Sequence, residues 1–143
     1  MNSELFEAVN SITADVRNWT EMQQVRSNGR ENLCGFCAIA AAELYRRFEK
    51  AGISSEIHMW LSDWGQAHVF VVVDDHVIDV TATQFDEFKH TPVVIMHQRE
   101  AEAHQFYTST ETFNSVKLLR ARQVKQKWPQ NQIVFRSQER QLT

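Results

Sequence analysis

Apolar residues recur at three- and four-residue steps near the N-terminus and again after a polar loop. The first run predicts a helix from Ser3 to about Trp19. The second predicts a helix over Cys37–Lys50, stopped by Gly52. The residues between them, 20–33, are polar and are expected to form a loop that contains Asn28-Gly29.

A period of two then replaces the helical period. Residues 53–61 alternate and predict a half-buried strand, and residues 68–73 are rich in β-branched side chains, which favour a strand. Asp74-Asp75 is expected to turn the chain into a returning strand over 76–81. A further strand is predicted over 93–96.

The C-terminal third is less regular. Residues 99–107 are consistent with a helix but show no apolar stripe, and residues 113–128 suggest a last helix that ends at Pro129. Residues 133–135 are expected to add an edge strand. Helices that precede an antiparallel sheet indicate an α+β fold, and the absence of a linker predicts one domain over residues 1–143.

The predicted hairpin places two polar side chains side by side. A two-residue turn at Asp74-Asp75 pairs Val73 with His76, and His68 and Asp79 then lie on one face as diagonal neighbours. The opposite face is wholly apolar, which favours this register. Its members are Val69, Val71, Val73, Ile78 and Val80.

Cys37 stands at the start of the second predicted helix. The unpaired N–H groups and the positive end of the helix dipole favour a thiolate there, and they can also bind an oxyanion. A thiol nucleophile needs a base, and the base needs a group that fixes its tautomer. We therefore expect Cys37 to attack, His68 to transfer the proton and Asp79 to orient the imidazole.

Composition narrows the possible functions. The net charge is −3, so no basic field indicates nucleic acid or an anionic membrane as a partner. No signal peptide is visible and no apolar run is long enough to span a bilayer. Two cysteines make no disulfide framework, so reduced thiols and a cytoplasmic location are expected; secretion without a classical signal peptide stays open.

An ordered set of short motifs resembles the transglutaminase-like branch of the papain-like superfamily. The motifs are Gly35-Phe36-Cys37, Gly52-Ile53, His68–Val72 and Val77–Thr81, within residues 33–85. The resemblance implies a papain-like fold with the cysteine helix packed on an antiparallel sheet, and a Cys-His-Asp triad. It implies a cysteine hydrolase or acyltransferase that acts on amides: a peptidase, an amidase, a protein-glutamine deamidase or a transglutaminase. The domain is small and the step from histidine to aspartate is short, so the substrate-binding flanks differ from those usual in the family.

Papain-like enzymes often use an upstream side chain as a second oxyanion donor. Asn32, Asn28, Gln24 and Trp19 are all candidates. Asn32 is also a candidate for substrate binding.

Trp60 and Trp64 flank the loop before His68. They either pack in the core or form a wall of the substrate cleft. Gln84-Phe85 is expected to pack beneath the site.

Other classes of function remain open. Cys34-Gly35-Phe36-Cys37 is a Cys-x-x-Cys motif, which is typical of thiol–disulfide exchange, although no parallel-sheet pattern surrounds it. A non-catalytic binding module on the same fold is a third hypothesis. No second ligand pair has zinc spacing, so neither a metal nor another cofactor is expected. The expected partner is a protein or peptide substrate, and the oligomeric state is left open.

Overall fold

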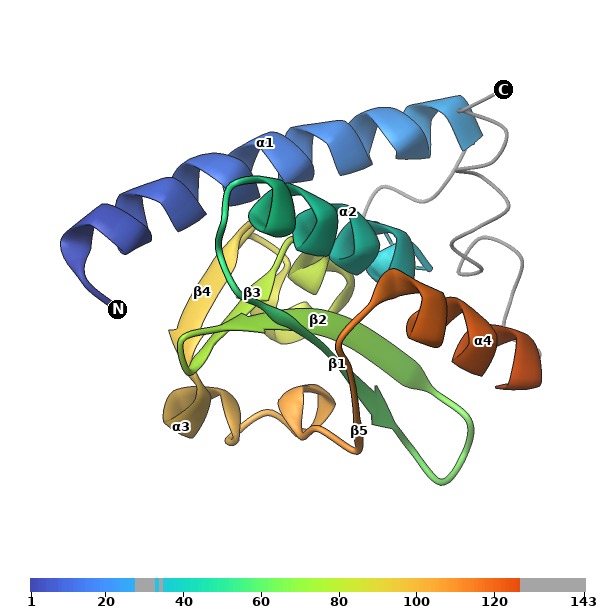
Figure 1. Cartoon of the computed structure of the whole chain (residues 1–143). Helices are drawn as coiled ribbons and strands as arrows, with labels where there is room; N and C mark the ends of the chain where they lie inside the picture. The colour runs from blue at the N-terminus through green and yellow to red at the C-terminus, as the bar shows by residue number, and fades with distance from the viewer. Residues whose placement is uncertain (28–32, 34, 127–143) are drawn as a thin grey trace.

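The computed structural model describes residues 1–27, 33 and 35–126 (Figure 1). The helices are α1 (Ser3–Ser27), α2 (Cys37–Lys50), α3 (Gln98–Ala101) and α4 (Val116–Gln126). The strands are β1 (Glu56–Leu61), β2 (Ala67–Val73), β3 (His76–Asp79), β4 (Val94–His97) and β5 (Glu111–Phe113). Short 3₁₀ turns occupy Ala82–Gln84, Asp86–Phe88 and Gln105–Tyr107. The described chain is therefore α+β, as the sequence predicted.

The strands form a five-stranded antiparallel sheet in the order β4-β3-β2-β1-β5. Helices α1 and α2 cover one face, and α3 with the neighbouring 3₁₀ turn lies across the other (Figure 1). The sheet thus lies between two layers, and each layer has its own apolar core.

The β2–β3 hairpin has the predicted register. Val73 pairs with His76, and Val72 pairs with Val77. The two turn residues have positive φ angles, 46° at Asp74 and 63° at Asp75. This is the backbone that a two-residue hairpin turn of type I′ requires, and aspartate tolerates it better than most residues.

The core under α2 explains the alanine-rich sequence of that helix. The five apolar residues predicted on one face of the hairpin are buried there together with the alanines of α2. Small side chains let the helix lie close to the sheet, while Leu44 and Phe48 fill the space further along it. Burial of each of these two larger side chains stabilises the fold by about 1.5–3 kcal/mol.

Helix α1 is longer than predicted. Residues 20–27 are helical instead of forming part of a loop. Thr20, Gln23 and Gln24 continue the buried stripe with polar side chains, which a pattern of apolar residues does not detect. Glutamine, glutamate and methionine in this stretch are good helix formers, so nothing ends the helix before Asn28-Gly29.

Strand β1 begins at Glu56 instead of residue 53, and it is buried on both faces. His58 and Trp60 lie on the face that a half-buried strand would leave exposed, but their side chains are only 7% and 6% exposed. The half-buried strand was therefore a wrong prediction. The reason is that residues 82–88 and 101–107 fold back over the second face, which local periodicity cannot show.

The C-terminal elements were predicted least well. Phe113 belongs to β5, where it pairs with Ile57, and not to the last helix, which begins at Val116. A strand of three residues is too short to show a period. The expected helix over 99–107 is only the single turn of α3 and a separate 3₁₀ turn. The predicted stop at Pro129 and the predicted strand 133–135 lie outside the described residues.

Within the described ranges, no helix combines the length and the apolar character needed to cross a membrane.

Candidate active site

His68 and Asp79 form a buried pair. The Nε2 atom of His68 lies 2.8 Å from Oδ2 of Asp79, and the two side chains are 0% and 2% exposed. His68 stands near the start of β2 and Asp79 ends β3, so the strands place both groups at the same end of the hairpin. The diagonal proximity predicted from the register is confirmed.

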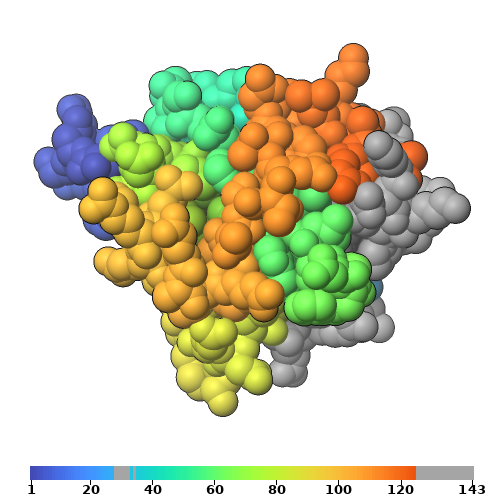
Figure 2. All heavy atoms as spheres, turned by 90° about the horizontal axis from the view of Figure 1, so that it is seen from below, coloured from blue at the N-terminus to red at the C-terminus, as the bar shows by residue number. Residues whose placement is uncertain are grey.

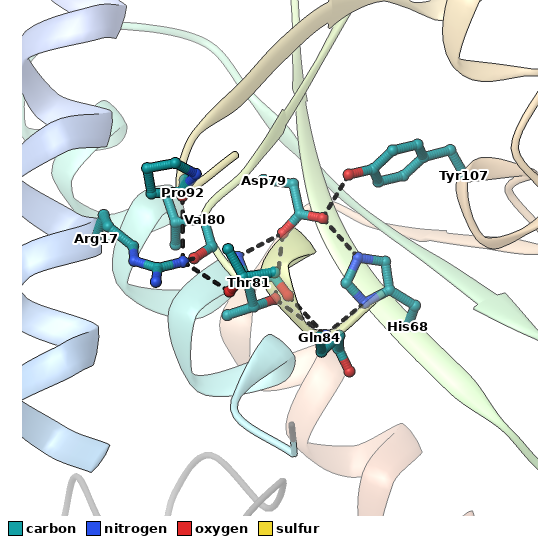
Figure 3. A network of polar contacts seen from close by, with 9 residues as sticks. Arg17, His68, Asp79, Val80, Thr81, Gln84, Pro92 and Tyr107 are labelled. Carbon is teal, nitrogen blue, oxygen red and sulfur yellow. Dashed lines mark hydrogen bonds and ion pairs between the residues drawn. The ribbon is translucent and has the colours of Figure 1, made fainter. Parts of the chain in front are cut away.

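Asp79 accepts hydrogen bonds at both carboxylate oxygens (Figure 3). Oδ1 accepts from the backbone N–H of Thr81 at 2.9 Å and from its hydroxyl at 3.2 Å. Oδ2 accepts from the hydroxyl of Tyr107 at 2.7 Å, as well as from His68. Burial by itself would raise the pKa of Asp79, but the charge of His68 and these hydrogen bonds lower it below its ordinary value. Asp79 is therefore ionised at neutral pH.

Cys37 begins α2 and is 1% exposed. Phe36 precedes it, and its side chain provides no cap to the helix. The first turn also carries no acidic residue. Nothing in this turn therefore offsets the positive end of the dipole at the sulfur.

The imidazole of His68 interacts with Cys37 as well as with Asp79. Burial would lower the pKa of His68, but the charge and hydrogen bond of Asp79, followed by the hydrogen bond and charge of Cys37, raise it to about 10. The imidazole is therefore protonated at neutral pH. Because Nε2 binds Asp79, Nδ1 is the ring nitrogen left to face the thiol. The structure thus brings together the three residues of the predicted triad.

The cysteine helix packs on the sheet, as the resemblance implies. It lies on the apolar face of the hairpin that contains Val69 and Val71. The pairing of β2 with β3 ends at Val71 and Ile78, so β3 does not continue beside His68. The imidazole of His68 interacts with Cys37, while its neighbours on the same face of β2, Phe70 and Val72, belong to the other apolar core.

Aromatic rings surround the imidazole of His68. Phe85 makes an edge contact with a centroid distance of 4.9 Å, and Phe70, Phe106 and Tyr107 lie at 6.0, 6.0 and 5.8 Å. The predicted contact of Phe85 with the site is confirmed. This apolar surround keeps water away from the charged groups and so strengthens their interaction.

Gln84, expected beneath the site, contributes a polar contact. Its amide nitrogen lies 3.0 Å from the carbonyl oxygen of Thr81 and 3.4 Å from Nδ1 of His68. A carbonyl can only accept, so the end of the amide that faces Nδ1 is a donor. It can hydrogen-bond to Nδ1 only when the imidazole is neutral, and beside the protonated ring it is a contact without a hydrogen bond.

The two predicted substrate-binding tryptophans differ in exposure. Trp60 pairs directly with His68 across β1 and β2 and is buried. Trp64 lies in the loop between these strands and is 66% exposed. The rings are 6.1 Å apart in an edge-to-face arrangement, so they connect the surroundings of His68 with the surface. The third predicted substrate-binding residue, Asn32, lies outside the described residues, as do Asn28 and Cys34.

Two candidates for the second oxyanion donor are described, both on α1. Trp19 packs against Leu33, Phe36 and Ile39, immediately around the start of α2. Gln24 is 9% exposed, and its side-chain nitrogen has no hydrogen-bond partner in the described part of the chain. Among the described residues, the buried amide of Gln24 therefore has a donor that no acceptor satisfies.

The sequence reasoning missed two residues that hold the site. Tyr107 binds Asp79 from a turn 28 residues further along the chain, and no local pattern points to it. Arg17 on α1 donates to the carbonyl of Val80 at 2.9 Å and to the hydroxyl of Thr83 at 3.0 Å. It appeared in the sequence only as a charged residue inside an apolar stripe.

No group of three or more His, Cys, Asp or Glu side chains in the described ranges is arranged to hold a metal ion.

Comparison with protein-family models finds no match to this chain, and comparisons with curated proteins and with solved structures find none either.

Proposed function

We propose that the protein is a cysteine-dependent amide hydrolase of papain-like fold, with Cys37 as nucleophile, His68 as general acid and base, and Asp79 as the group that orients His68. One observation carries the proposal. A fully buried imidazole is bonded at 2.8 Å to a carboxylate and also interacts with a thiol at a helix start, and its pKa is raised to about 10. A thiolate beside an imidazolium is the resting state that this chemistry needs.

The proposed reaction proceeds through an acyl-enzyme. The sulfur of Cys37 bonds to the carbonyl carbon, and the charge moves to the carbonyl oxygen near the N-terminus of α2. The C–N bond then breaks, and Nδ1 of His68 gives its proton to the leaving amine. Water attacks the thioester, His68 takes its proton, the acid is released and Cys37 leaves as thiolate. Asp79 holds Nε2 throughout.

The fold supports the same proposal. The helix that carries Cys37 lies against the central strand β2, which carries His68, and Asp79 follows on the antiparallel neighbour β3. This is the order of elements and residues that the resemblance to the transglutaminase-like branch implies. A cytoplasmic location fits the proposal because the thiol must stay reduced.

The proposed substrate is a protein or peptide with a peptide or side-chain amide bond. Acyl transfer to an amine differs from hydrolysis only in what attacks the thioester. A primary amine added to an active preparation distinguishes them: an amine adduct in place of the free acid indicates transfer.

The first test is the pH dependence of iodoacetamide alkylation, read for each cysteine by mass spectrometry. We expect alkylation of Cys37 at pH 6–7 to depend on the charged imidazole of His68. His68→Ala should abolish this reactivity at low pH. His76→Ala is the matched control, because His76 lies on the same hairpin but bonds to the carbonyl of Asp74 and makes an edge contact with His97.

Cys34→Ala separates the proposal from a redox function. The hydrolase keeps its Cys37 reactivity and turnover without Cys34, whereas a dithiol exchange protein needs both cysteines. The proposal is overturned if Cys37 reacts like an ordinary free thiol in wild type and in His68→Ala alike.

A further inference from the structure

Tyr107 contacts the candidate triad although it lies far from these three residues in the sequence. It ends the 3₁₀ turn Gln105–Tyr107, on the face of the sheet opposite α2, and is 4% exposed. Its hydroxyl donates to Oδ2 of Asp79 at 2.7 Å (Figure 3). Viewed from below in Figure 2, the segment around residues 98–109 is spread over the surface of this side of the molecule.

The hydroxyl of Tyr107 acts only as a donor to Asp79. An ionised carboxylate has no hydrogen to give, so the hydrogen in this bond is that of the phenol. Burial, followed by the charge of Asp79, raises the pKa of Tyr107 far above its ordinary value. The phenol is therefore neutral at neutral pH and keeps the hydrogen that it donates to Asp79.

Tyr107 and His68 bind the same carboxylate oxygen. Oδ1 of Asp79 is fixed separately by the N–H and the hydroxyl of Thr81. Three donors thus hold the carboxylate without any help from the imidazole. The hydrogen bond from Tyr107 reduces the negative charge on Oδ2. It therefore weakens the hydrogen bond between Oδ2 and Nε2 of His68.

The ring of Tyr107 adds a steric contact. Its centroid lies 5.8 Å from that of His68 and 5.2 Å from that of Phe70. A single side chain therefore restrains Asp79 through its hydroxyl and borders the imidazole through its ring.

We propose that Tyr107 is a positioning residue of the site: its hydroxyl fixes the Asp79 carboxylate and sets how strongly Oδ2 holds His68. The kinetic part of this inference rests on the proposed hydrolase function. The effect of Tyr107 on the hydrogen bond between Asp79 and His68 does not depend on that function, because the resonances of the His68 imidazole measure it directly.

The chain offers a matched pair of variants. It has two tyrosines, and the other, Tyr45, donates its hydroxyl to the backbone carbonyl of Asn114 away from the site. Tyr107→Phe removes the donor to Asp79, and Tyr45→Phe removes a comparable hydroxyl elsewhere. In the Tyr45→Phe background, 3-fluorotyrosine incorporated by the cell labels position 107 alone and makes its phenol a stronger donor.

The principal readout is the ¹H and ¹⁵N resonance of the Nε2–H of His68 in the intact protein. Tyr107→Phe should move the proton signal downfield, because Oδ2 then binds His68 alone, and fluorotyrosine should move it upfield. In Tyr107→Phe the charged carboxylate of Asp79 has one hydrogen-bond donor fewer. Asp79 should therefore be protonated, and its ion pair with His68 lost, at a higher pH than in wild type. Tyr45→Phe should leave the signal unchanged. Once a substrate is in hand, Tyr107→Phe should lower kcat about tenfold with KM within twofold.

Opposite shifts for Tyr107→Phe and fluorotyrosine support the inference, even in a protein that hydrolyses no amide; in that case only the proposed function fails. Unchanged His68 signals in both overturn the inference, even in an active enzyme. If Tyr107→Phe does not fold, the fluorotyrosine protein decides by itself: an upfield shift supports the inference and no shift overturns it.

Discussion

The guanidinium of Arg17 donates a hydrogen bond of 2.9 Å to the carbonyl of Val80, the residue that directly follows Asp79. The same nitrogen lies 3.0 Å from the hydroxyl of Thr83 and 3.3 Å from the carbonyl of Pro92 (Figure 3). Helix α1 thereby holds the segment from which Asp79 enters the site. This bond connects the N-terminal helix, far away in sequence, to the geometry of the candidate triad.

Arg17→Met should destabilise the protein by about 3 kcal/mol, because it leaves buried carbonyls without a donor. Urea denaturation gives the free energy of unfolding. Arg26→Met is the control on the same helix; Arg26 is exposed, so we expect a change of at most about 0.5 kcal/mol. Equal effects of the two variants would show that the bonds of Arg17 add nothing to the fold.

Stability should depend on pH through the pair His68 and Asp79. The pKa of His68 is raised from 6.5 to about 10 on folding, so its contribution is complete below pH 6.5 and is lost as the pH rises through about 10. The pKa of Asp79 is lowered, so its contribution is present above the ordinary carboxyl pKa and is lost as the pH falls through the folded value. The pair therefore stabilises the fold most between these limits.

The measurement compares wild type with His68→Gln by urea denaturation between pH 6 and 9.5. The stability of wild type relative to the variant should fall by about 1 kcal/mol for each pH unit at the steepest point. Taking the difference removes titrations that both proteins share. Two parallel curves would mean that His68 does not gain a proton on folding.

Trp60 and Trp64 should respond differently to substitution. Trp60 is buried beside His68, so Trp60→Ala should cost about 3–5 kcal/mol in unfolding free energy. Trp64 is 66% exposed, so Trp64→Ala should change stability by at most about 0.5 kcal/mol. If Trp64 borders the substrate, its loss raises KM severalfold and leaves kcat unchanged. An unchanged KM would show that Trp64 does not contact the substrate.

The sequence predicted those parts of the site that local chain geometry controls. His68 and Asp79 belong to one hairpin, and the turn Asp74-Asp75 together with an apolar face defines its register, so their proximity follows from alternation alone. Cys37 was identified because a helix start changes the chemistry of a thiol. Each of these inferences needs only the residues of one or two adjacent elements.

The remaining parts depend on contacts between distant segments. Tyr107 reaches Asp79 only because residues 101–107 fold back over the second face of the sheet, and their sequence shows no period that predicts this. Arg17 and Gln24 are polar residues on the buried side of α1. A search for apolar residues at helical spacing does not detect that they are buried. Burial on both faces of β1 was missed for the same reason as Tyr107.

Gln24 allows the last prediction, because its buried amide nitrogen has no hydrogen-bond partner among the described residues. A buried donor without a partner destabilises a fold, so Gln24→Leu should leave the free energy of unfolding unchanged or raise it by about 1 kcal/mol. If this amide instead serves a developing oxyanion, the same variant should lose about a hundredfold in kcat. A residue that only packs cannot produce gained stability together with lost turnover. Gln23→Leu is the control, since Gln23 is a buried neighbour that has a partner. Turnover that survives in Gln24→Leu would leave Trp19 as the remaining described candidate for the second oxyanion donor.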